Sequence, residues 1–430
     1  KKVREYDGKR LLIAALARVA GLQLPSNFVQ VRKEGLDADP MGYFQGLAEA
    51  NPWVLITPLV VKPDMLFGQR GKNNLVLLKA DWSAAEAFVR DRMGMTLDIK
   101  GVVGSLTAFI VEPFVPHKDE YYMCMQTVRG GEKISFGACG GVDIEENWDR
   151  VKELVIPPTA SIEEFDLRAQ FMGDVADDQT QVVLASFIRA CFLVYQDEDM
   201  TLLEMNPLTI DDKGYPTPLD IRVELDTYAA FKNMQSWKDV EFPEPWGREK
   251  CVEEIQVQKM DDKSGASLKL SVLNPKGHIW TMVAGGGASV IYADTVVDLG
   301  LGNELGNYAE YSGNPKEEET YRYARLLLGL ATRHIDGKRR GLLIGGGVAN
   351  FTDVAATFTG IIQAIKDYRG KIQESKMKIF VRRGGPNYKT GLRLMEELGA
   401  DLDLPIEVYG PETNMTKIVE LCIAYVSGTG

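Results

Sequence analysis

The chain has 430 residues, of which 45% are hydrophobic and 26% are charged, and its formal net charge is -12 at pH 7. This composition is typical of globular proteins, and the length suffices for about two or three domains with separate cores. The negative charge argues against a nucleic-acid-binding protein, because phosphate contacts need a basic face. The five cysteines lie far apart without a CxxC pair, so we expect neither disulfides nor a zinc site, and a reducing cytoplasm.

The N-terminal segment has only a superficial likeness to a signal peptide. Lys1, Lys2 and Arg4 precede the apolar run 11–17, but Arg18 ends this run early. We therefore expect an amphipathic helix that belongs to the folded domain. No other segment reaches the ~18 uncharged apolar residues of a membrane span, so we expect no contact with a membrane.

Short apolar runs alternate with turn residues in the first part of the chain. The expected strands cover residues 53–61, 75–79, 108–111, 121–128, 134–137, 201–203 and 217–220. Helical patterns cover 84–93 and 179–196, so the sequence predicts a mixed α/β domain with antiparallel hairpins. The Pro-rich stretch 241–247 indicates a semi-rigid linker, and we expect domains at 1–244 and 245–430.

After this stretch the pattern changes to a repeated order of strand, Gly-rich turn and helix. The expected strand and helix pairs are 279–283 with 288–299, 342–344 with 354–368, and 379–381 with 388–398. Such alternation predicts a doubly wound parallel sheet of the flavodoxin-like type. Ligands of such sheets bind at the carboxyl ends of the strands, where the Gly-rich turns lie.

Cationic residues surround a Gly-containing loop in the first domain. Lys62 ends an apolar strand, and the loop 68–72 follows with two glycines and two cations. Backbone N–H groups and cations in such a loop can hold phosphates, and Lys62 and Arg70 would neutralise charge during phosphoryl transfer as catalytic residues. No Walker signature is present, and a solvated basic turn is the alternative.

The segment 202–208 contains the carboxylate Glu204 and the amide Asn206, and a second carboxylate, Asp220, follows. Mg²⁺ on a nucleotide takes only one or two protein oxygen ligands, so two strands ending in Asn206 and Asp220, joined through the turn 211–214, would suffice. The alternative is a strand end with a surface carboxylate. The extended segment 110–116 can present backbone groups to an adenine edge.

Together these motifs occur in the order expected of an ATP-grasp domain. Segments 61–64, 70–72, 112–117 and 204–208 resemble the ATP-grasp part of the ATP-citrate lyase family and, more distantly, the β subunit of succinyl-CoA synthetase. This resemblance assigns ATP to Lys62, Arg70, Gly71, Pro113, Val115, Glu120 and Asp220. It assigns Mg²⁺ to Asn206 and Asp220.

Glycines and polar residues follow the strands expected in the second domain. The turns 285–287 and 345–347 leave bare backbone N–H groups where helices start, which favours an anion. Asn350 and Thr352 either cap the next helix or bind a carboxylate, and Arg383 makes either a bidentate ligand contact or a surface ion pair. Neither glycine cluster has the GxGxxG pattern with a later acidic residue, which argues against a dinucleotide.

Segments 264–270, 274–277, 280–289, 310–313, 349–352 and 381–388 resemble the citrate-binding domain of the same family, whose fold is of the CoA-ligase type. The resemblance assigns citrate to Gly285, Gly286, Ala288, Gly313, Asn350, Thr352, Tyr368 and Arg383. It assigns a second cation to Asp261, Ser264 and Ala266.

The resemblance covers nearly all of residues 3–427 and implies the ATP- and citrate-binding subunit of a two-subunit ATP-citrate lyase. Such an enzyme makes acetyl-CoA and oxaloacetate from citrate, CoA and ATP by way of citryl-CoA. The CoA-binding, phosphohistidine and citryl-CoA-cleaving parts would belong to a second subunit of a hetero-oligomer. The alternatives are a citryl-CoA synthetase subunit, less favourably a succinyl-CoA synthetase β subunit, and a non-catalytic regulatory subunit.

Overall fold

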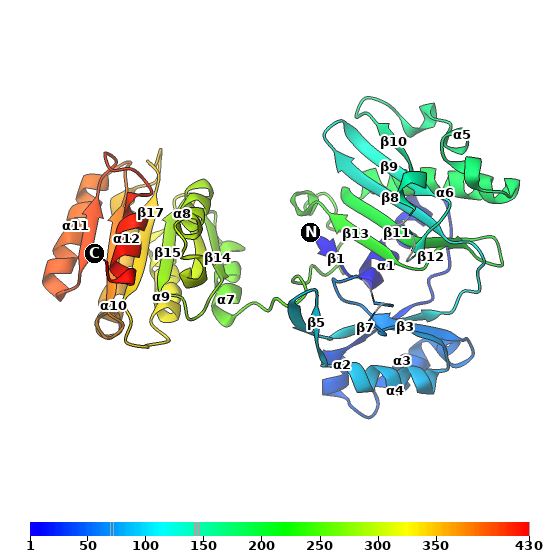
Figure 1. The fold of residues 1–430 in the computed structure, drawn as a ribbon, viewed down its shortest axis with the longest axis horizontal. Coiled ribbons are helices and arrows are strands. Elements are labelled where there is room, and N and C mark those ends of the chain that lie inside the picture. The colour runs from blue at the N-terminus through cyan, green and yellow to red at the C-terminus, as the bar shows by residue number, and fades with distance from the viewer. Residues whose placement is uncertain (69, 72, 142–143, 145–146, 430) are drawn as a thin grey trace. The chain divides into compact units, whose positions relative to one another are not determined.

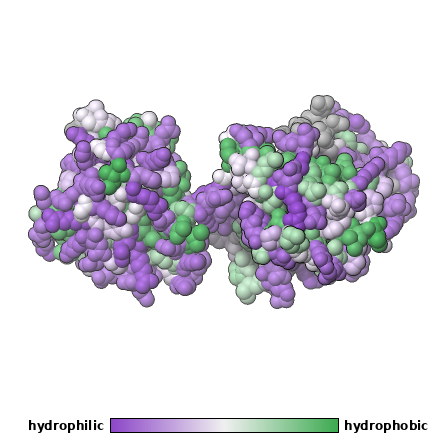
Figure 2. Space-filling view, turned by 90° about the horizontal axis from the view of Figure 1, so that it is seen from below, coloured by the Kyte–Doolittle hydropathy of each residue, from purple (hydrophilic) through white to green (hydrophobic). Residues whose placement is uncertain are grey.

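The computed structural model describes residues 1–68, 70–71, 73–141, 144 and 147–429. The chain forms two compact units, Lys1–Arg248 and Glu249–Gly430 (Figure 1). The visible surface is mostly hydrophilic, with hydrophobic residues in small separate groups (Figure 2). Within the described ranges, no helix combines the length and the apolar character needed to span a bilayer.

A four-stranded antiparallel sheet forms one part of the first unit. Its order is β2 (Val29–Arg32), β7 (Ala108–Pro113), β3 (Leu59–Pro63) and β4 (Leu77–Ala80). Three helices, α2 (Lys33–Ala38), α3 (Tyr43–Ala50) and α4 (Trp82–Arg92), accompany it, with the hairpin β5 (Thr96–Ile99) and β6 (Val102–Ser105). Alternate residues of β3 enter the core, so Leu59 and Val61 are fully buried while Lys62 is directed toward the other sheet.

A larger antiparallel sheet forms the other part of the first unit. Its order is β1 (Lys2–Val3), β13 (Ile221–Leu225), β11 (Met200–Ile210), β8 (Tyr121–Val128), β9 (Gly131–Gly137) and β10 (Lys152–Ile156), with β12 (Pro216–Pro218) paired to β11. The helices α1 (Glu5–Ala20), α5 (Leu167–Phe171) and α6 (Asp178–Asp197) share its core. The predicted turn 211–214 is confirmed, because it closes the β11–β12 hairpin with Gly214 at a φ of 83°.

The second unit contains a six-stranded sheet in which only the edge strand β14 is antiparallel. Its order is β14 (Ser267–Val272), β16 (Asn307–Ser312), β15 (Ile279–Ala284), β17 (Arg340–Gly346), β18 (Met377–Arg382) and β19 (Ile406–Tyr409). One core contains α8 (Gly286–Asp298) and α12 (Lys417–Ser427), and the other contains α7 (Val252–Asp261), α9 (Glu317–Ala331), α10 (Val354–Glu374) and α11 (Tyr388–Leu402). Helices therefore cover both faces, and the predicted doubly wound fold is confirmed.

Short 3₁₀ turns connect several of these elements. They are η1 (Pro52–Leu55), η3 (Trp148–Arg150), η4 (Ile162–Glu164), η5 (Met172–Asp174), η6 (Thr227–Ala229) and η7 (Gly302–Glu304). The predicted strand 53–61 is wrong in its first half, because Pro52 starts η1 and β3 begins only at Leu59. The predicted strand 217–220 is also too long, since β12 ends at Pro218.

The Pro-rich segment before the second unit is attached to the first unit. The Trp246 ring packs on Phe67 with centroids 4.6 Å apart, and its Nε1 donates to the carbonyl of Val102 at 2.9 Å. Glu241 pairs with Arg4 at 2.8 Å and with Arg32 at 2.7 Å. These contacts hold 241–246 to the surface of the first unit, although the proline content resembles that of a spacer.

Asp64, which follows β3, is fully buried and forms no ion pair within the described part of the chain, although the charge of Arg4 lowers its pKa slightly. Its carboxyl group accepts hydrogen bonds from Gln30 Nε2 at 2.6 Å and from the backbone N–H of Tyr6 at 3.3 Å. Burial nevertheless raises the pKa of Asp64 to about 6, because it penalises the charged form more than these donors stabilise it.

This raised pKa predicts a stability that falls with pH. Between the ordinary value of 3.8 and about 6, the folded state holds the proton that the unfolded state has released, so ionisation opposes folding fully above that range. We expect Asp64→Asn to raise the free energy of unfolding at pH 8 and to lose this advantage at pH 4, measured by urea unfolding. Asp401→Asn, an exposed control, should show no such difference. An equal effect of Asp64→Asn at both pH values would contradict the prediction.

Candidate functional site

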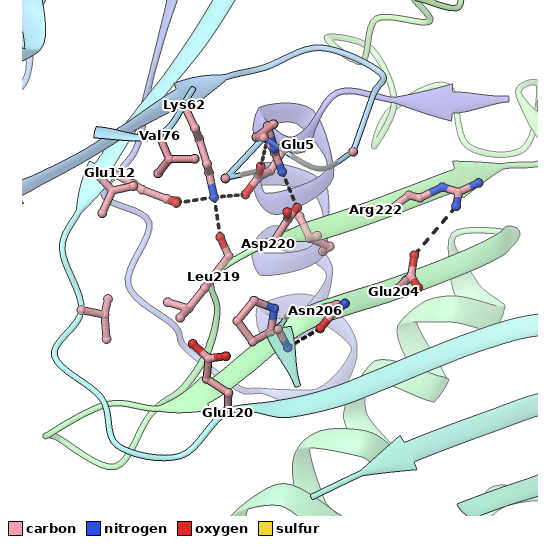
Figure 3. Close-up of a pocket in the computed structure, with 18 of the residues that line it drawn as sticks. Glu5, Lys62, Val76, Glu112, Glu120, Glu204, Asn206, Leu219, Asp220 and Arg222 are labelled. Atoms are coloured by element: carbon pink, nitrogen blue, oxygen red, sulfur yellow. Dashed lines mark hydrogen bonds and ion pairs between the residues drawn. The ribbon is translucent and has the colours of Figure 1, made fainter. Parts of the chain in front are cut away.

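A cavity of about 670 Å³ lies between the two sheets of the first unit (Figure 3). Strands β3 and β7 line it from the four-stranded sheet, and β11 and β13 line it from the larger sheet. The volume falls within the range of small-molecule and cofactor sites. The cavity brings together all residues predicted for the nucleotide and its cation: Lys62, Arg70, Gly71, Pro113, Val115, Glu120, Asn206 and Asp220.

Lys62 is only 6% exposed and points to two carboxylates. Its ammonium lies 2.8 Å from Glu5 and 2.8 Å from Glu112, and it also donates to the carbonyl of Leu219. Burial lowers the pKa of Lys62, but Glu112 and Glu5 raise it by more, so the pKa lies well above its ordinary value. Lys62 is therefore a cation at neutral pH.

Arg70 is also buried, at 8% exposure, so the alternative of a solvated basic turn is wrong for this residue. Its guanidinium lies 2.7 Å from Glu5 and 2.5 Å from Asp220, and it donates to the carbonyl of Pro63 at 2.9 Å. Gln69 and Lys72 of the predicted phosphate-binding loop lie outside the described residues. Arg70 thus joins the loop to both sheets.

Asn206 and Asp220 lie side by side, because the backbone N–H of Asn206 donates to the carbonyl of Asp220 at 3.0 Å. The prediction that their strands end at these residues is wrong: β11 continues to Ile210, and Asp220 lies just before β13. The side-chain oxygen of Asn206 accepts the N–H of Gly141 at 2.6 Å, and the side chain of Asp220 is 41% exposed. Amide and carboxylate oxygens suit a hard cation such as Mg²⁺.

The described part of the chain contains no group of three or more His, Cys, Asp or Glu side chains that could hold a metal ion by itself. A cation between Asn206 and Asp220 therefore needs further oxygens from a bound nucleotide or from water. This requirement agrees with the few protein ligands that Mg²⁺ takes in nucleotide sites.

The second unit gathers a different set of residues at the carboxyl ends of its parallel strands. Gly285, Gly286 and Ala288 follow β15, and Gly313 follows β16. Asn350 and Thr352 lie between β17 and α10, and Arg383 follows β18. The helices after β15 and β17 pack in different cores, so this edge contains a switch point, which is the usual ligand position in such sheets.

Two arginines are buried at this edge without a carboxylate partner among the described residues. Arg382 is 6% exposed and donates to the carbonyls of Gly346, Pro411 and Thr413 at 2.9 to 3.0 Å. Arg383 is 4% exposed and donates to the carbonyl of Gly347 at 2.7 Å. The alternative of a surface ion pair is therefore wrong for Arg383. Uncompensated buried cations favour an anionic ligand.

Helix α10 does not depend on Asn350 or Thr352 for its N-terminal cap. Asp353 is the cap, because its carboxylate accepts the backbone N–H of Ala356 at 3.0 Å. Its second oxygen accepts from Asn387 at 2.6 Å. The capping alternative for Thr352 is wrong, and Asn350 and Thr352 remain candidates for ligand contacts.

Tyr368 is not brought to this edge. It follows Val354, the first residue of α10, by roughly 21 Å of helix at 1.5 Å per residue. It lies instead in a separate hollow of about 450 Å³ with Gly329 and Lys371. The structure thus separates Tyr368 from the other residues predicted for citrate.

The predicted second cation position lies between α7 and β14. One carboxylate oxygen of Asp261 accepts the N–H of Leu268 at 2.8 Å, and the other pairs with Lys269. Ser264 Oγ accepts the N–H of Ala266 at 3.0 Å. The three predicted residues Asp261, Ser264 and Ala266 are close together, but both oxygens of Asp261 already have donors.

Sequence reasoning missed two tyrosines beside the buried arginines. The hydroxyl groups of Tyr292 and Tyr311 are buried without a hydrogen-bond partner in the described part of the chain. Burial raises the pKa of Tyr311, although the charge of Arg383 acts in the opposite direction. Tyr311 lies in the segment 310–313, which was noted in the sequence. Tyr292 lies in the helix expected at 288–299, and no sequence pattern places it beside an arginine.

Close packing of Tyr292 against Gly345 gives a test of this arrangement. A Cβ atom at Gly345 would lie 2.3 Å from the Tyr292 ring, whereas one at Gly347 would meet nothing within 4 Å. We expect Gly345→Ala to destabilise the chain by about 1–3 kcal/mol, as overpacked cores do. Gly347→Ala is the matched control and should unfold like the wild type in thermal denaturation. Equal stability of the two variants would contradict this packing.

The chain matches two family models and several proteins. Residues 1–237 match the "ATP-citrate synthase ATP-grasp domain" and residues 248–425 match "ATP citrate lyase citrate-binding". The chain is 52% identical to ATP-citrate synthase alpha chain protein 2 of Arabidopsis thaliana, over 99% of both. It is 42% identical to human ATP-citrate synthase, over 99% of this chain but 38% of the human protein. The solved ATP citrate lyase of Methanothrix soehngenii, in complex with citrate and coenzyme A, superposes with a TM-score of 0.88 at 42% identity, covering 98% of this chain and 99% of that one. The chain therefore belongs to the ATP-citrate synthase family, also called ATP citrate lyase.

Proposed function

We propose that this chain is the ATP- and citrate-binding subunit of an ATP-citrate lyase, which makes acetyl-CoA and oxaloacetate with a second subunit. The proposal rests on one observation: this chain belongs to the family and has two cationic sites, one in each of its units. The cavity of the first unit holds Lys62 and Arg70, and the strand edge of the second unit holds the uncompensated Arg383. The first suits a nucleotide and the second suits a carboxylate.

In the first unit, Lys62 and Arg70 are the groups that neutralise charge as the terminal phosphoryl group of ATP is transferred. Gly71 allows the loop backbone to approach the phosphates, and Pro113 and Val115 line the cavity where the adenine binds. Glu120, which is 3.0 Å from His117 Nε2, lines the same cavity. Asn206 and Asp220 hold Mg²⁺, which when bound neutralises charge on the phosphate oxygens.

In the second unit, Arg383 binds a citrate carboxylate, and Asn350 and Thr352 donate hydrogen bonds to it. The backbone N–H groups at Gly285, Gly286 and Ala288 open helix α8, whose dipole favours an anion, and Gly313 lies at the same strand edge. Tyr368 is left out of this proposed site because α10 carries it away from the strand edge.

The reaction also needs parts that lie on a second subunit of a cytoplasmic hetero-oligomer. This chain spans 38% of the human relative's length, which supports further parts for CoA binding, phosphohistidine formation and citryl-CoA cleavage. Two of the three histidines of this chain have other side-chain partners. His278 is held between Glu304 and Asp336, and His117 is held by the carbonyl of Val115 and by Glu120.

We expect Lys62→Met and Asp220→Ala to abolish ATP-dependent turnover while citrate binding persists, because the two ligands occupy different units. The loss of a positioned charge in phosphoryl transfer commonly costs at least ~3 kcal/mol, which is about a hundredfold in rate. The measurement is acetyl-CoA formation by the complex of this chain with its partner subunit. Lys232→Met, which removes an exposed lysine paired with Asp199, is the matched control. Turnover above about a tenth of wild type in either variant would refute the ATP-grasp roles.

We expect Arg383→Ala to weaken citrate binding far more than ATP binding. A buried charge-assisted contact of this kind is worth roughly 2 to 5 kcal/mol. Calorimetric titration of citrate into this chain measures the effect. Arg393→Ala is the control, because Arg393 is exposed on α11 and pairs with Glu397 at 2.7 Å. Unchanged citrate affinity in Arg383→Ala would remove Arg383 from the site, and equally tight binding of succinate would point to a different acid.

A further inference from the structure

Lys9 on α1 shares all of its partners with Lys62. Its ammonium lies 2.9 Å from Glu5 and 2.5 Å from Glu112, and it donates to the carbonyl of Leu219 at 3.4 Å. Lys62 contacts these same three groups. Among the described residues that line the cavity, Lys62 is present and Lys9 is not, so Lys9 forms a second layer of charge.

These residues form a set of charges that is balanced without a ligand. The cations are Lys9, Lys62 and Arg70, and the anions are Glu5, Glu112 and Asp220. Of these three cations, Lys62 and Arg70 line the cavity, so a nucleotide that binds them there replaces carboxylates with phosphates as their partners. Buried carboxylates that lose their cations are strongly destabilised.

Glu5 is the carboxylate most affected by this exchange. Burial raises its pKa, but Lys62, Lys9 and Arg70 together lower it by more, so Glu5 stays ionised. Its Oε1 lies 2.9 Å from the Lys9 ammonium and 2.8 Å from the Lys62 ammonium. Two cations therefore compensate the same oxygen, so Lys9 still compensates it when Lys62 leaves.

The position of Lys9 is fixed by the packing of α1. Glu5 and Lys9 are one helical turn apart and so lie on the same face of the helix. Between them, Gly8 brings the helix so close to β13 that a Cβ atom there would meet Val223 at 3.0 Å. Lys9 is thus held beside both carboxylates whether or not Lys62 is turned away.

We propose that Lys9 is a positioning residue for ATP, because it keeps Glu5 and Glu112 compensated while Lys62 and Arg70 turn to the phosphates. The inference rests on the proposed function of the cavity. Without the charge of Lys9, the buried Glu5 and the partly buried Glu112 would retain Lys62 and oppose nucleotide binding. The effect acts on nucleotide affinity and leaves citrate binding unchanged.

The test compares Lys9→Met with Lys9→Arg and with Lys33→Met. Lys33 also pairs with a carboxylate four residues away, Asp37, but this pair is exposed. We expect Lys9→Met to raise the Kd of this chain for MgADP and for Mg-AMPPNP about tenfold or more, because Glu112 would then have no cation among its described partners once Lys62 turns to the phosphates. In the complex with the partner subunit, KM for ATP should rise similarly while kcat at saturating ATP changes by less than about threefold. Lys9→Arg and Lys33→Met should resemble the wild type.

A double variant separates charge balance from structural damage. Lys9→Met with Glu112→Gln removes one charge of each sign, so it should fold and recover most of the nucleotide affinity, even if Lys9→Met alone unfolds. Wild-type affinity in Lys9→Met, or no recovery in the double variant, would overturn the role of Lys9. If Lys62→Met also keeps its turnover, the proposed function itself fails, whereas an inactive Lys62→Met confines the failure to Lys9.

Discussion

Charge compensation inside the first unit is the constraint on which its construction depends. Glu5 of α1 is contacted by Lys62 of β3 and by Arg70 of the following loop, and Arg70 continues to Asp220 beside β13. These contacts join a helix and both sheets through residues that are far apart in the chain. Removal of one of these residues would leave the opposite charge buried and unpaired, which is unfavourable. The contacts therefore fix the positions of Lys62 and Arg70 at the cavity.

The second unit differs, because the buried cations at the carboxyl ends of its parallel strands have no carboxylate partners among the described residues. Arg382 and Arg383 are buried with backbone carbonyls as partners and with no carboxylate of the described chain within ion-pair distance. A carboxylate ligand there meets cations that are already free of competing anions, whereas a nucleotide in the first unit must replace Glu5 and Glu112. The proposed nucleotide binding is therefore an exchange of anions, and the proposed citrate binding is an addition of one.

The parts of the fold that could be predicted are those set by local pattern. The apolar run at 121–128 and the long helical pattern at 179–196 match β8 and α6 closely. The segment 53–58 could not be assigned correctly, because its apolar residues suit a strand while Pro52 favours a helical turn. Residues that carry a motif, such as Asn206, could be predicted to lie together at the cavity. Tyr292 could not be predicted beside the arginines, because only the packing of α8 on Gly345 brings its ring there.

Burial and distance along the chain decide between alternatives that the sequence left open. Arg70 and Arg383 both have alternatives as surface cations, since nothing in a single sequence distinguishes a buried guanidinium from an exposed one. The resemblance assigned both Thr352 and Tyr368 to citrate, but the length of α10 separates Tyr368 from Thr352. Glu5 and Lys9 were missed because they resemble an ordinary i,i+4 pair on a helix surface, and only the approach of α1 to β13 turns that pair into a buried counter-charge for the cavity.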